Sequence, residues 1–172
     1  MITSIKNLIK KEVSKQELVE FIMGQEEHSW MLNNRYVQAH LLDFFERLPK
    51  KILQEVFIDK MTLMVRSNGR YACSVGKLQQ NIVIIFPEVY ERMTKAHDGW
   101  SKAILAHEVG HIHLNHSESV DDDELEKQVD ADRFACDMGY LEELEAFLHE
   151  QVDSVEVRVR LSFITSYYFS QN

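Results

Sequence analysis

The first sixty residues have the hydrophobic pattern of helices. Residues 14–17, SKQE, fit a capping box, in which serine and glutamate side chains satisfy open backbone N–H groups, and Gly24 offers a stop. From residue 30 to 48 the apolar residues recur at helical spacing until Pro49 ends the pattern. These residues are Trp30, Val37, Leu41, Phe44, Phe45 and Leu48. Because their spacing follows the helical period, we assign them to the core.

The pattern changes to short strand-like runs in the middle of the chain. The segments MTLMV (61–65) and RYACSV (70–75) flank Ser67-Asn68-Gly69, and Asn-Gly tolerates the positive φ of a tight hairpin turn. A third run, NIVIIF (81–86), is rich in β-branched residues and is closed by Pro87. The sequence therefore predicts a small antiparallel sheet between helical segments.

Helical patterns return after the third run. Ser101 can cap a helix through KAILAHEVGHIHLNH (102–116), on which Leu105, Val109 and Ile112 form an apolar stripe. The acidic segment SVDDDELE (119–126) predicts a loop and a helix start, where the helix dipole favours acidic residues. The segment VEVRVRLSF (155–163) alternates like a strand, but Ser154 in front of it as a cap favours a helix.

Composition narrows the possible partners. The chain has 172 residues, 45% of them hydrophobic, which suits one soluble domain. Its formal net charge of −9 repels phosphate backbones and no basic stripe offsets it, so we expect no nucleic-acid partner. No apolar run approaches the length of a membrane span, and the start MITSIKNLIKKE lacks the features of a signal peptide. We expect a cytoplasmic protein without a membrane partner.

The most specific chemical pattern is His107-Glu108-x-x-His111. Two histidines one helical turn apart point the same way and can share one zinc ion, with Glu108 beside its open side. There the glutamate can act as general base toward an activated water and then pass the proton to a leaving amine. His113 and His116 follow closely and are interpreted as surface or supporting residues.

The segments WSKAILAHEVGHIHLNH (100–116) and ADRFACDMGY (131–140) resemble the gluzincin zinc metallopeptidases, especially soluble single-domain relatives of the CAAX-prenyl and heat-shock membrane proteases. The resemblance covers residues 78–140 and extends to VEVRVRLSFI (155–164), which is similar to the family's last helix. It implies a zinc-dependent endopeptidase that acts on a peptide or protein substrate. Residues 81–86 stand where the family has the edge strand that pairs with substrate.

The fold that the resemblance implies is zincin-like and of the α+β class. We expect one metallopeptidase domain over residues 1–172, with a helical part at 1–60, the sheet and active-site helices at 61–140, and C-terminal helices at 141–172. The membrane helices of the larger relatives have no counterpart in this sequence.

The resemblance also implies a third zinc ligand, a glutamate on the next helix, followed four residues later by an aspartate that orients the first histidine. Gln128 stands at the position of the glutamate and Asp132 at that of the aspartate, while Ala131 and Ala135 match two alanines of the pattern. The third ligand therefore departs from the family's pattern. The amide oxygen of Gln128 or the carboxylate of Asp132 could take its place.

Two further alternatives stay open for this ligand. Glu124 lies one turn before Gln128, and a shifted register would use Glu126 with Asp130 as its partner. In a regular helix the shifted pair points about 200° away from Gln128 and Asp132, which favours the latter two.

The altered ligand position keeps two other functions open. One is a zincin-like binding or regulatory protein with little or no catalysis. The other is an ImmA-type regulatory peptidase, although such enzymes usually carry Asn where this chain has Asp132. Tyr140 and His113 are candidates for stabilising an oxyanion, and each also fits a purely structural role.

Overall fold

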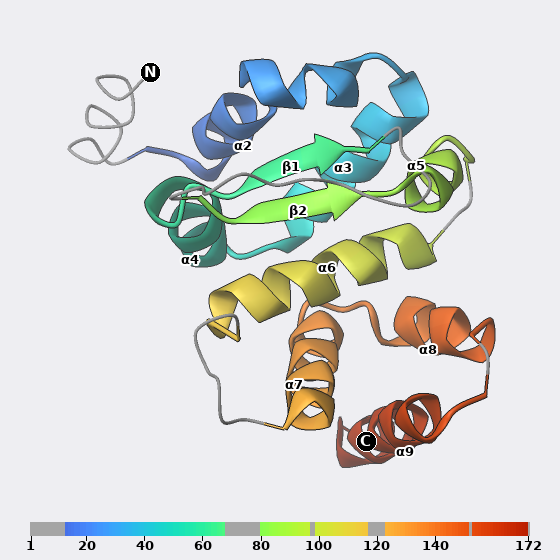
Figure 1. The fold of residues 1–172 in the computed structure, drawn as a ribbon. Coiled ribbons are helices and arrows are strands. Elements are labelled where there is room, and N and C mark those ends of the chain that lie inside the picture. Colours follow the sequence, from blue (N-terminus) through green and yellow to red (C-terminus); the bar gives the residue numbers. More distant parts are fainter. Residues whose placement is uncertain (1–12, 68–79, 97–98, 117–122, 152, 172) are drawn as a thin grey trace. The chain divides into compact units, whose positions relative to one another are not determined.

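The computed structural model describes residues 13–67, 80–96, 99–116, 123–151 and 153–171 (Figure 1). The chain divides into two compact units, Met1–Thr94 and Lys95–Asn172. The first unit holds a small sheet with helices, and the second is formed by helices in its described part. The α+β class is therefore consistent with the structure. Within the described ranges, no helix is both long enough and apolar enough to cross a membrane.

The helices of the first unit begin and end largely where local sequence signals predict. The capping box is confirmed, since Glu17 N–H donates to Ser14 Oγ over 3.1 Å and Ser14 N–H donates to the Glu17 carboxylate over 2.7 Å. Gly24 ends this helix, as predicted. The elements of the unit are α2 (Lys15–Met23), η1 (Glu26–Leu32), α3 (Arg35–Arg47), α4 (Lys50–Leu53), η2 (Gln54–Asp59), β1 (Leu63–Arg66), β2 (Ile82–Ile85) and α5 (Pro87–Met93).

The apolar pattern from residue 30 to 48 belongs to two helices. Trp30 lies in the 3-10 helix η1, and α3 begins only at Arg35. The break occurs because the Asn34 side chain accepts hydrogen bonds from the backbone N–H groups of Tyr36 and Val37 and so starts a new helix. The assignment of these apolar residues to the core is confirmed, since they are buried.

The predicted antiparallel pairing is wrong, because β1 and β2 run parallel (Figure 1). Leu63 pairs with Ile82 and Arg66 with Ile85. The prediction assumed that each strand pairs with its neighbour in sequence through a hairpin, whereas the first and third predicted runs pair directly. A parallel pair needs a connection much longer than a hairpin turn. The predicted turn at Asn68-Gly69 and the run 70–75 lie outside the described residues.

Side chains from η1 cover the outer edge of β1. Met64 N–H donates to His28 Nε2 over 2.9 Å, and Trp30 Nε1–H donates to the Met64 carbonyl over 3.1 Å. His28 is fully buried and donates from Nδ1 to the Ile22 carbonyl. Burial lowers the pKa of His28 and keeps the ring neutral, which leaves Nε2 free to accept. The backbone of β1 is thus engaged on both sides.

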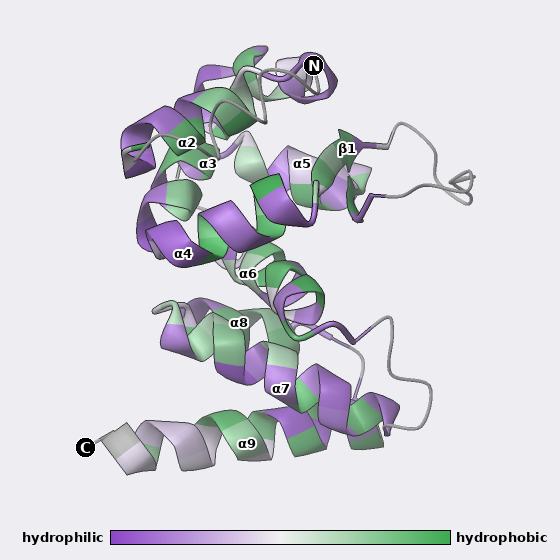
Figure 2. Cartoon of the chain, turned by 90° about the vertical axis from the view of Figure 1, so that its left-hand side faces the viewer, coloured by the Kyte–Doolittle hydropathy of each residue, from purple (hydrophilic) through white to green (hydrophobic). Residues whose placement is uncertain are grey.

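In its described residues the second unit consists of four helices. Figure 2 shows hydrophilic and hydrophobic residues mixed along α9. They are α6 (Trp100–His113), α7 (Glu124–Asp137), α8 (Leu141–His149) and α9 (Val155–Gln171). The predicted cap at Ser101 is wrong: α6 begins at Trp100 after Gly99, and Ser101 is buried inside its first turn. The predicted C-terminal helix is confirmed, and Ser154 Oγ accepts from Val157 N–H over 3.1 Å.

The helices α6 and α7 approach each other closely at Gly110. A Cβ atom at this position would lie 3.1 Å from Phe134 Cβ and 3.3 Å from Ala131 Cα. Such distances leave no room for a side chain without a shift of the α7 backbone. Glycine inside the motif HEVGH therefore permits the approach that brings side chains of α7 onto the motif histidines.

Candidate metal centre

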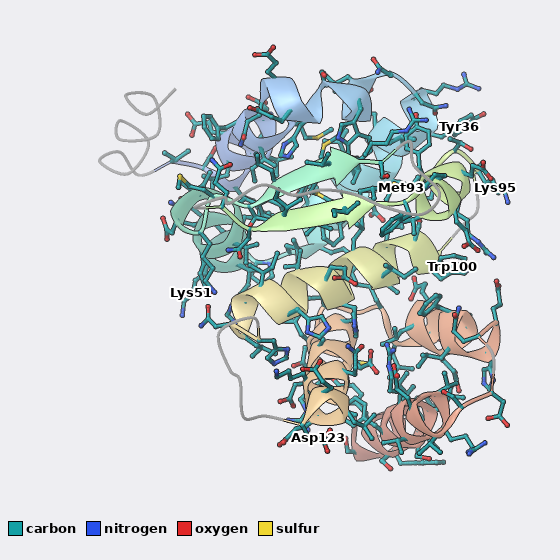
Figure 3. The ribbon with its side chains drawn as sticks, viewed as in Figure 1. Tyr36, Lys51, Met93, Lys95, Trp100 and Asp123 are labelled. Atoms are coloured by element: carbon teal, nitrogen blue, oxygen red, sulfur yellow. The ribbon has the colours of Figure 1, made fainter. Side chains whose placement is uncertain are left out.

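The two motif histidines lie one turn apart on α6, whose first residue Trp100 is labelled in Figure 3. The His107 and His111 rings are 4.6 Å apart between centroids and nearly perpendicular, at 83°. Their Nε2 atoms are 3.0 Å apart. Glu108, the next residue after His107, is exposed. The helix therefore directs two imidazole nitrogens to one point and leaves the motif carboxylate accessible.

A third donor atom comes from α7, the helix that starts after Asp123 (Figure 3). The Asp123 side chain accepts from Leu125 N–H and caps this helix. One turn into α7, Gln128 places its Oε1 atom 3.1 Å from His107 Nε2. The amide oxygen therefore lies close to His107 Nε2, the atom that also lies close to His111 Nε2.

Asp132 lies one turn beyond Gln128 and engages the opposite side of the His107 ring. Its Oδ1 atom is 2.8 Å from His107 Nδ1. Arg160 on α9 donates from Nε to Oδ2 over 2.7 Å and from Nη2 to Oδ1 over 2.8 Å. Asp132 is fully buried and Arg160 is 7% exposed. Both carboxylate oxygens of Asp132 are therefore engaged by His107 Nδ1 and Arg160, on the side of the ring opposite to Nε2.

The charge state of Asp132 follows from these contacts. Burial opposes its ionisation, but the hydrogen bonds from His107 and Arg160 and the charge of Arg160 outweigh burial and lower the pKa of the carboxyl. An ionised carboxylate only accepts hydrogen bonds, so His107 carries its proton on Nδ1. A neutral His107 ring then presents a lone pair at Nε2.

The donor set fits a metal ion. His107 Nε2 and Gln128 Oε1 both present lone pairs, and at 3.1 Å they repel each other unless a proton or a metal cation lies between them. Two donors bound to one tetrahedral zinc at about 2.0–2.1 Å stand roughly 3.3 Å apart. The observed separations of 3.0 and 3.1 Å are close to that value. Imidazole nitrogen is a ligand type that suits zinc, and the neutral amide oxygen is a weaker donor than a carboxylate.

The environment of His111 keeps this ring available as a ligand. Desolvation, aided by the neighbouring His107, His116 and Arg160, lowers the pKa of His111 to about 4. The ring is therefore neutral near pH 7. Its Nδ1 atom lies 2.8 Å from His116 Nδ1, and its Nε2 atom faces His107.

The other acidic candidates for the third ligand point elsewhere. Glu124 forms an ion pair with Lys127 over 3.0 Å, Glu126 is exposed, and Asp130 lies 3.6 Å from Arg133. In the part of the chain that the structure describes, no group of three or more His, Cys, Asp or Glu side chains is arranged to hold a metal. The two histidines thus find their nearest third donor in an amide.

The two candidates for oxyanion stabilisation are both packed within the second unit. Tyr140 is fully buried at the start of α8. The His113 ring lies 5.4 Å from the Phe134 ring between centroids. Each of these side chains therefore has a packing role in the structure.

Arg160 was not among the predicted site residues, and no specific contact was predicted for His116. Arg160 lies one helical turn before the buried Ile164, at a position where an apolar residue would be expected. A charged residue on a buried helix face requires an opposite charge nearby. An arginine at an expected apolar position was therefore the sequence feature that could have indicated a buried ion pair such as that with Asp132.

One comparison with known proteins matches a large part of the chain. A family model described as Peptidase family M48 matches residues 32–123, which is more than half of the chain. The match includes both motif histidines and Glu108 and ends before α7 begins. Searches of curated proteins and of solved structures gave no match.

Proposed function

Because the chain belongs to peptidase family M48, we propose that it is a zinc-dependent endopeptidase in which His107, His111 and Gln128 hold the metal. Family membership indicates a metallopeptidase, and zinc is the metal typical of the family. The observation that carries the proposal is the position of His107 Nε2, which lies 3.0 Å from His111 Nε2 and 3.1 Å from Gln128 Oε1. Asp132 is the residue that orients His107.

The proposed reaction is hydrolysis of a peptide bond. Zinc, when bound, supplies a Lewis acid that activates a water molecule and polarises the scissile carbonyl. Glu108 accepts the proton of the attacking water at its carboxylate and delivers it to the nitrogen of the leaving amine. Its exposed position beside His107 suits this role. Asp132 and Arg160 keep the His107 proton on Nδ1 and its lone pair directed toward the metal.

Substrate binding is proposed along β2. Its neighbour β1 is engaged by β2 on one side and by His28 and Trp30 on the other. The carbonyls of Asn81 and Ile85 accept hydrogen bonds from the β1 side. The alternation of a strand then turns the Ile84 N–H group to the other edge, where an extended peptide can pair with it.

Gln128 supports a second candidate function, a zincin-like binding protein with little catalysis. An amide oxygen is neutral and binds zinc less strongly than a carboxylate. A weakly held metal would lower turnover while an extended partner segment could still bind to β2. The exposed Glu108 favours the peptidase, because a structural zinc site has no use for a general base.

The test compares zinc content and peptide cleavage in wild-type protein and the Glu108→Gln variant. Protein purified without chelator should contain about one zinc per chain. Glu108→Gln should keep the zinc and lose cleavage by roughly 10²–10⁴-fold. Glu126→Gln, an exposed change outside the donor cluster, is the control and should retain both properties. Cleavage by Glu108→Gln at the wild-type rate would overturn the proposed mechanism.

A second variant separates the two candidate functions. Gln128→Glu supplies a charged ligand and should tighten zinc binding by on the order of tenfold, equivalent to about 1.4 kcal/mol. Increased cleavage by this variant would support a peptidase with a weakened metal site. Tighter zinc with no cleavage of any peptide by wild-type protein or this variant would favour the binding protein.

A further inference from the structure

At the C-terminal end of α6 the chain turns back, so that His116 contacts the motif residue His111. We propose that His116 is a positioning residue that holds the ring of His111 in its metal-binding orientation. This inference rests on the proposed zinc site and assigns it a residue beyond the proposed ligands and Glu108. It is carried by the backbone geometry of the helix end and by the contact between the two rings.

The backbone geometry is set by Asn115, which has a φ of 57°. Asparagine tolerates this left-handed conformation better than most residues with a side chain. Asn115 N–H donates to the Ile112 carbonyl over 3.2 Å, and His116 N–H donates to the His111 carbonyl over 3.1 Å. These two bonds form a Schellman motif, which closes the helix and turns the chain back along it.

This turn returns His116 to the side of the helix where His111 lies. The two ring centroids are 5.0 Å apart at an interplanar angle of 70°, and the two Nδ1 atoms are 2.8 Å apart. One backbone hydrogen bond and one side-chain contact thus join the same pair of residues. The backbone of His116 cannot move away from His111 without loss of the helix cap, and the ring contact then fixes its side chain.

The direction of the ring hydrogen bond follows from metal binding. A histidine that binds metal through Nε2 carries its proton on Nδ1. His111 Nδ1–H then donates to the lone pair of His116 Nδ1, and His116 carries its own proton on Nε2. Since the His111 ring can rotate about its Cβ–Cγ bond, this hydrogen bond holds Nε2 toward His107 and Gln128. Removal of such supporting contacts typically weakens metal binding.

The experiment measures the zinc dissociation constant of the full chain by competition with a chromogenic chelator. Cobalt(II) substitution adds a visible spectrum that reports ligand geometry. His116→Leu removes the acceptor, whereas His116→Asn places Oδ1 near the position of Nδ1. His149→Leu, an exposed histidine at the end of α8, is the matched control. Thermal unfolding of each metal-free variant reports loss of the fold.

The expected result is that His116→Leu weakens zinc binding by roughly 10–100-fold and alters the cobalt spectrum. His116→Asn should restore most of the affinity and the wild-type spectrum, and His149→Leu should match wild type. Wild-type affinity and spectrum in His116→Leu would overturn the inference. Equal losses in His116→Leu and His116→Asn, with lower metal-free stability in both, would also overturn it by indicating a purely structural role.

The same measurements distinguish this inference from the proposed function. Wild-type protein that binds no zinc would overturn the proposed zinc site, and the His116 assignment with it. Wild-type protein that binds zinc as tightly as His116→Leu would overturn the His116 assignment alone. Zinc binding in wild type with a selective loss in His116→Leu would support both.

Discussion

His107 and His111 stand one turn apart in the same motif, yet the structure supports them in different ways. The Nδ1 atom of His107 binds Asp132, which in turn binds Arg160, so residues from two further helices support its orientation. The Nδ1 atom of His111 binds His116, which the end of the same helix supplies. One histidine depends on tertiary structure for its orientation, and the other depends on a local helix cap.

The difference has energetic consequences. Asp132 and Arg160 are an almost fully buried ion pair, and removal of one partner leaves a charge without compensation in the interior. His116 is only half-buried, and its contact with His111 needs no net charge. Changes on the His107 side should therefore affect both folding and metal binding, whereas changes on the His111 side should act mainly on metal binding.

The largest effect is expected from Asp132→Ala. This change leaves Arg160 buried without its partner and should lower the free energy of unfolding by about 3–5 kcal/mol. It should also weaken zinc binding by roughly 10–100-fold, because His107 loses its orienting group. Chemical denaturation of metal-free protein and chelator competition measure the two effects. Asp130→Ala, on the same helix, is the control, and an equal loss of stability there would contradict the assignment.

The double variant Asp132→Leu with Arg160→Met separates the two roles of the ion pair. Well-packed apolar residues in place of a buried ion pair are often neutral for stability. We expect the double variant to unfold within about 1–2 kcal/mol of wild type while its zinc binding remains weak. Denaturation and zinc titration of the double variant and each single variant form a complete cycle. Wild-type zinc affinity in the double variant would show that His107 needs no orienting group.

A smaller effect is expected from Asn115→Val, on the His111 side. A β-branched residue at a φ of 57° costs about 1–2 kcal/mol, so the helix end should open and His116 should leave His111. Asn115→Gly accepts this backbone conformation and should stay close to wild type. Zinc affinity and thermal unfolding of both variants test this. Equal zinc affinity in the two variants would show that zinc binding does not depend on the helix cap.

The smallest effect near neutral pH concerns proton binding by Asp132. Its pKa is lower in the folded protein than the usual value of 3.8, so the unfolded chain binds the proton more readily. The stabilisation is complete above the unfolded pKa and is lost as pH falls through the folded pKa. Metal-free wild-type protein should lose stability as pH falls below about 4, and this slope should flatten in Asp132→Asn. An unchanged slope in Asp132→Asn would show that a group other than Asp132 causes the loss of stability at low pH.

Features that depend on neighbouring residues were predictable from the sequence. The cap formed by Ser14 and Glu17 and the helix that follows Ser154 both rest on side chains that reach backbone groups three residues away. The shared face of His107 and His111 follows from the helical repeat alone. The predicted cap at Ser101 is wrong because α6 begins at Trp100, two residues before the predicted start, so that Ser101 lies inside the first turn.

Features that depend on packing were decided by the tertiary structure. The periodicity of α7 placed Gln128 and Asp132 on one face and left the third ligand open between them. The close approach at Gly110 and the contact with Arg160 then directed Asp132 to His107 Nδ1 and Gln128 to Nε2. No residue within one helical turn of Gln128 or Asp132 determines which of the two side chains reaches which nitrogen of His107.

The parallel pairing of β1 and β2 shows the same limit in the first unit. A strand pattern indicates which faces of a strand are buried, but the partner strand is chosen by the path of the chain between them. By itself, the sequence determined the HExxH motif and the helix that carries it, from which the proposed chemistry follows. The third donor and the buried ion pair required the folded structure, because they join residues more than twenty positions apart through side-chain packing.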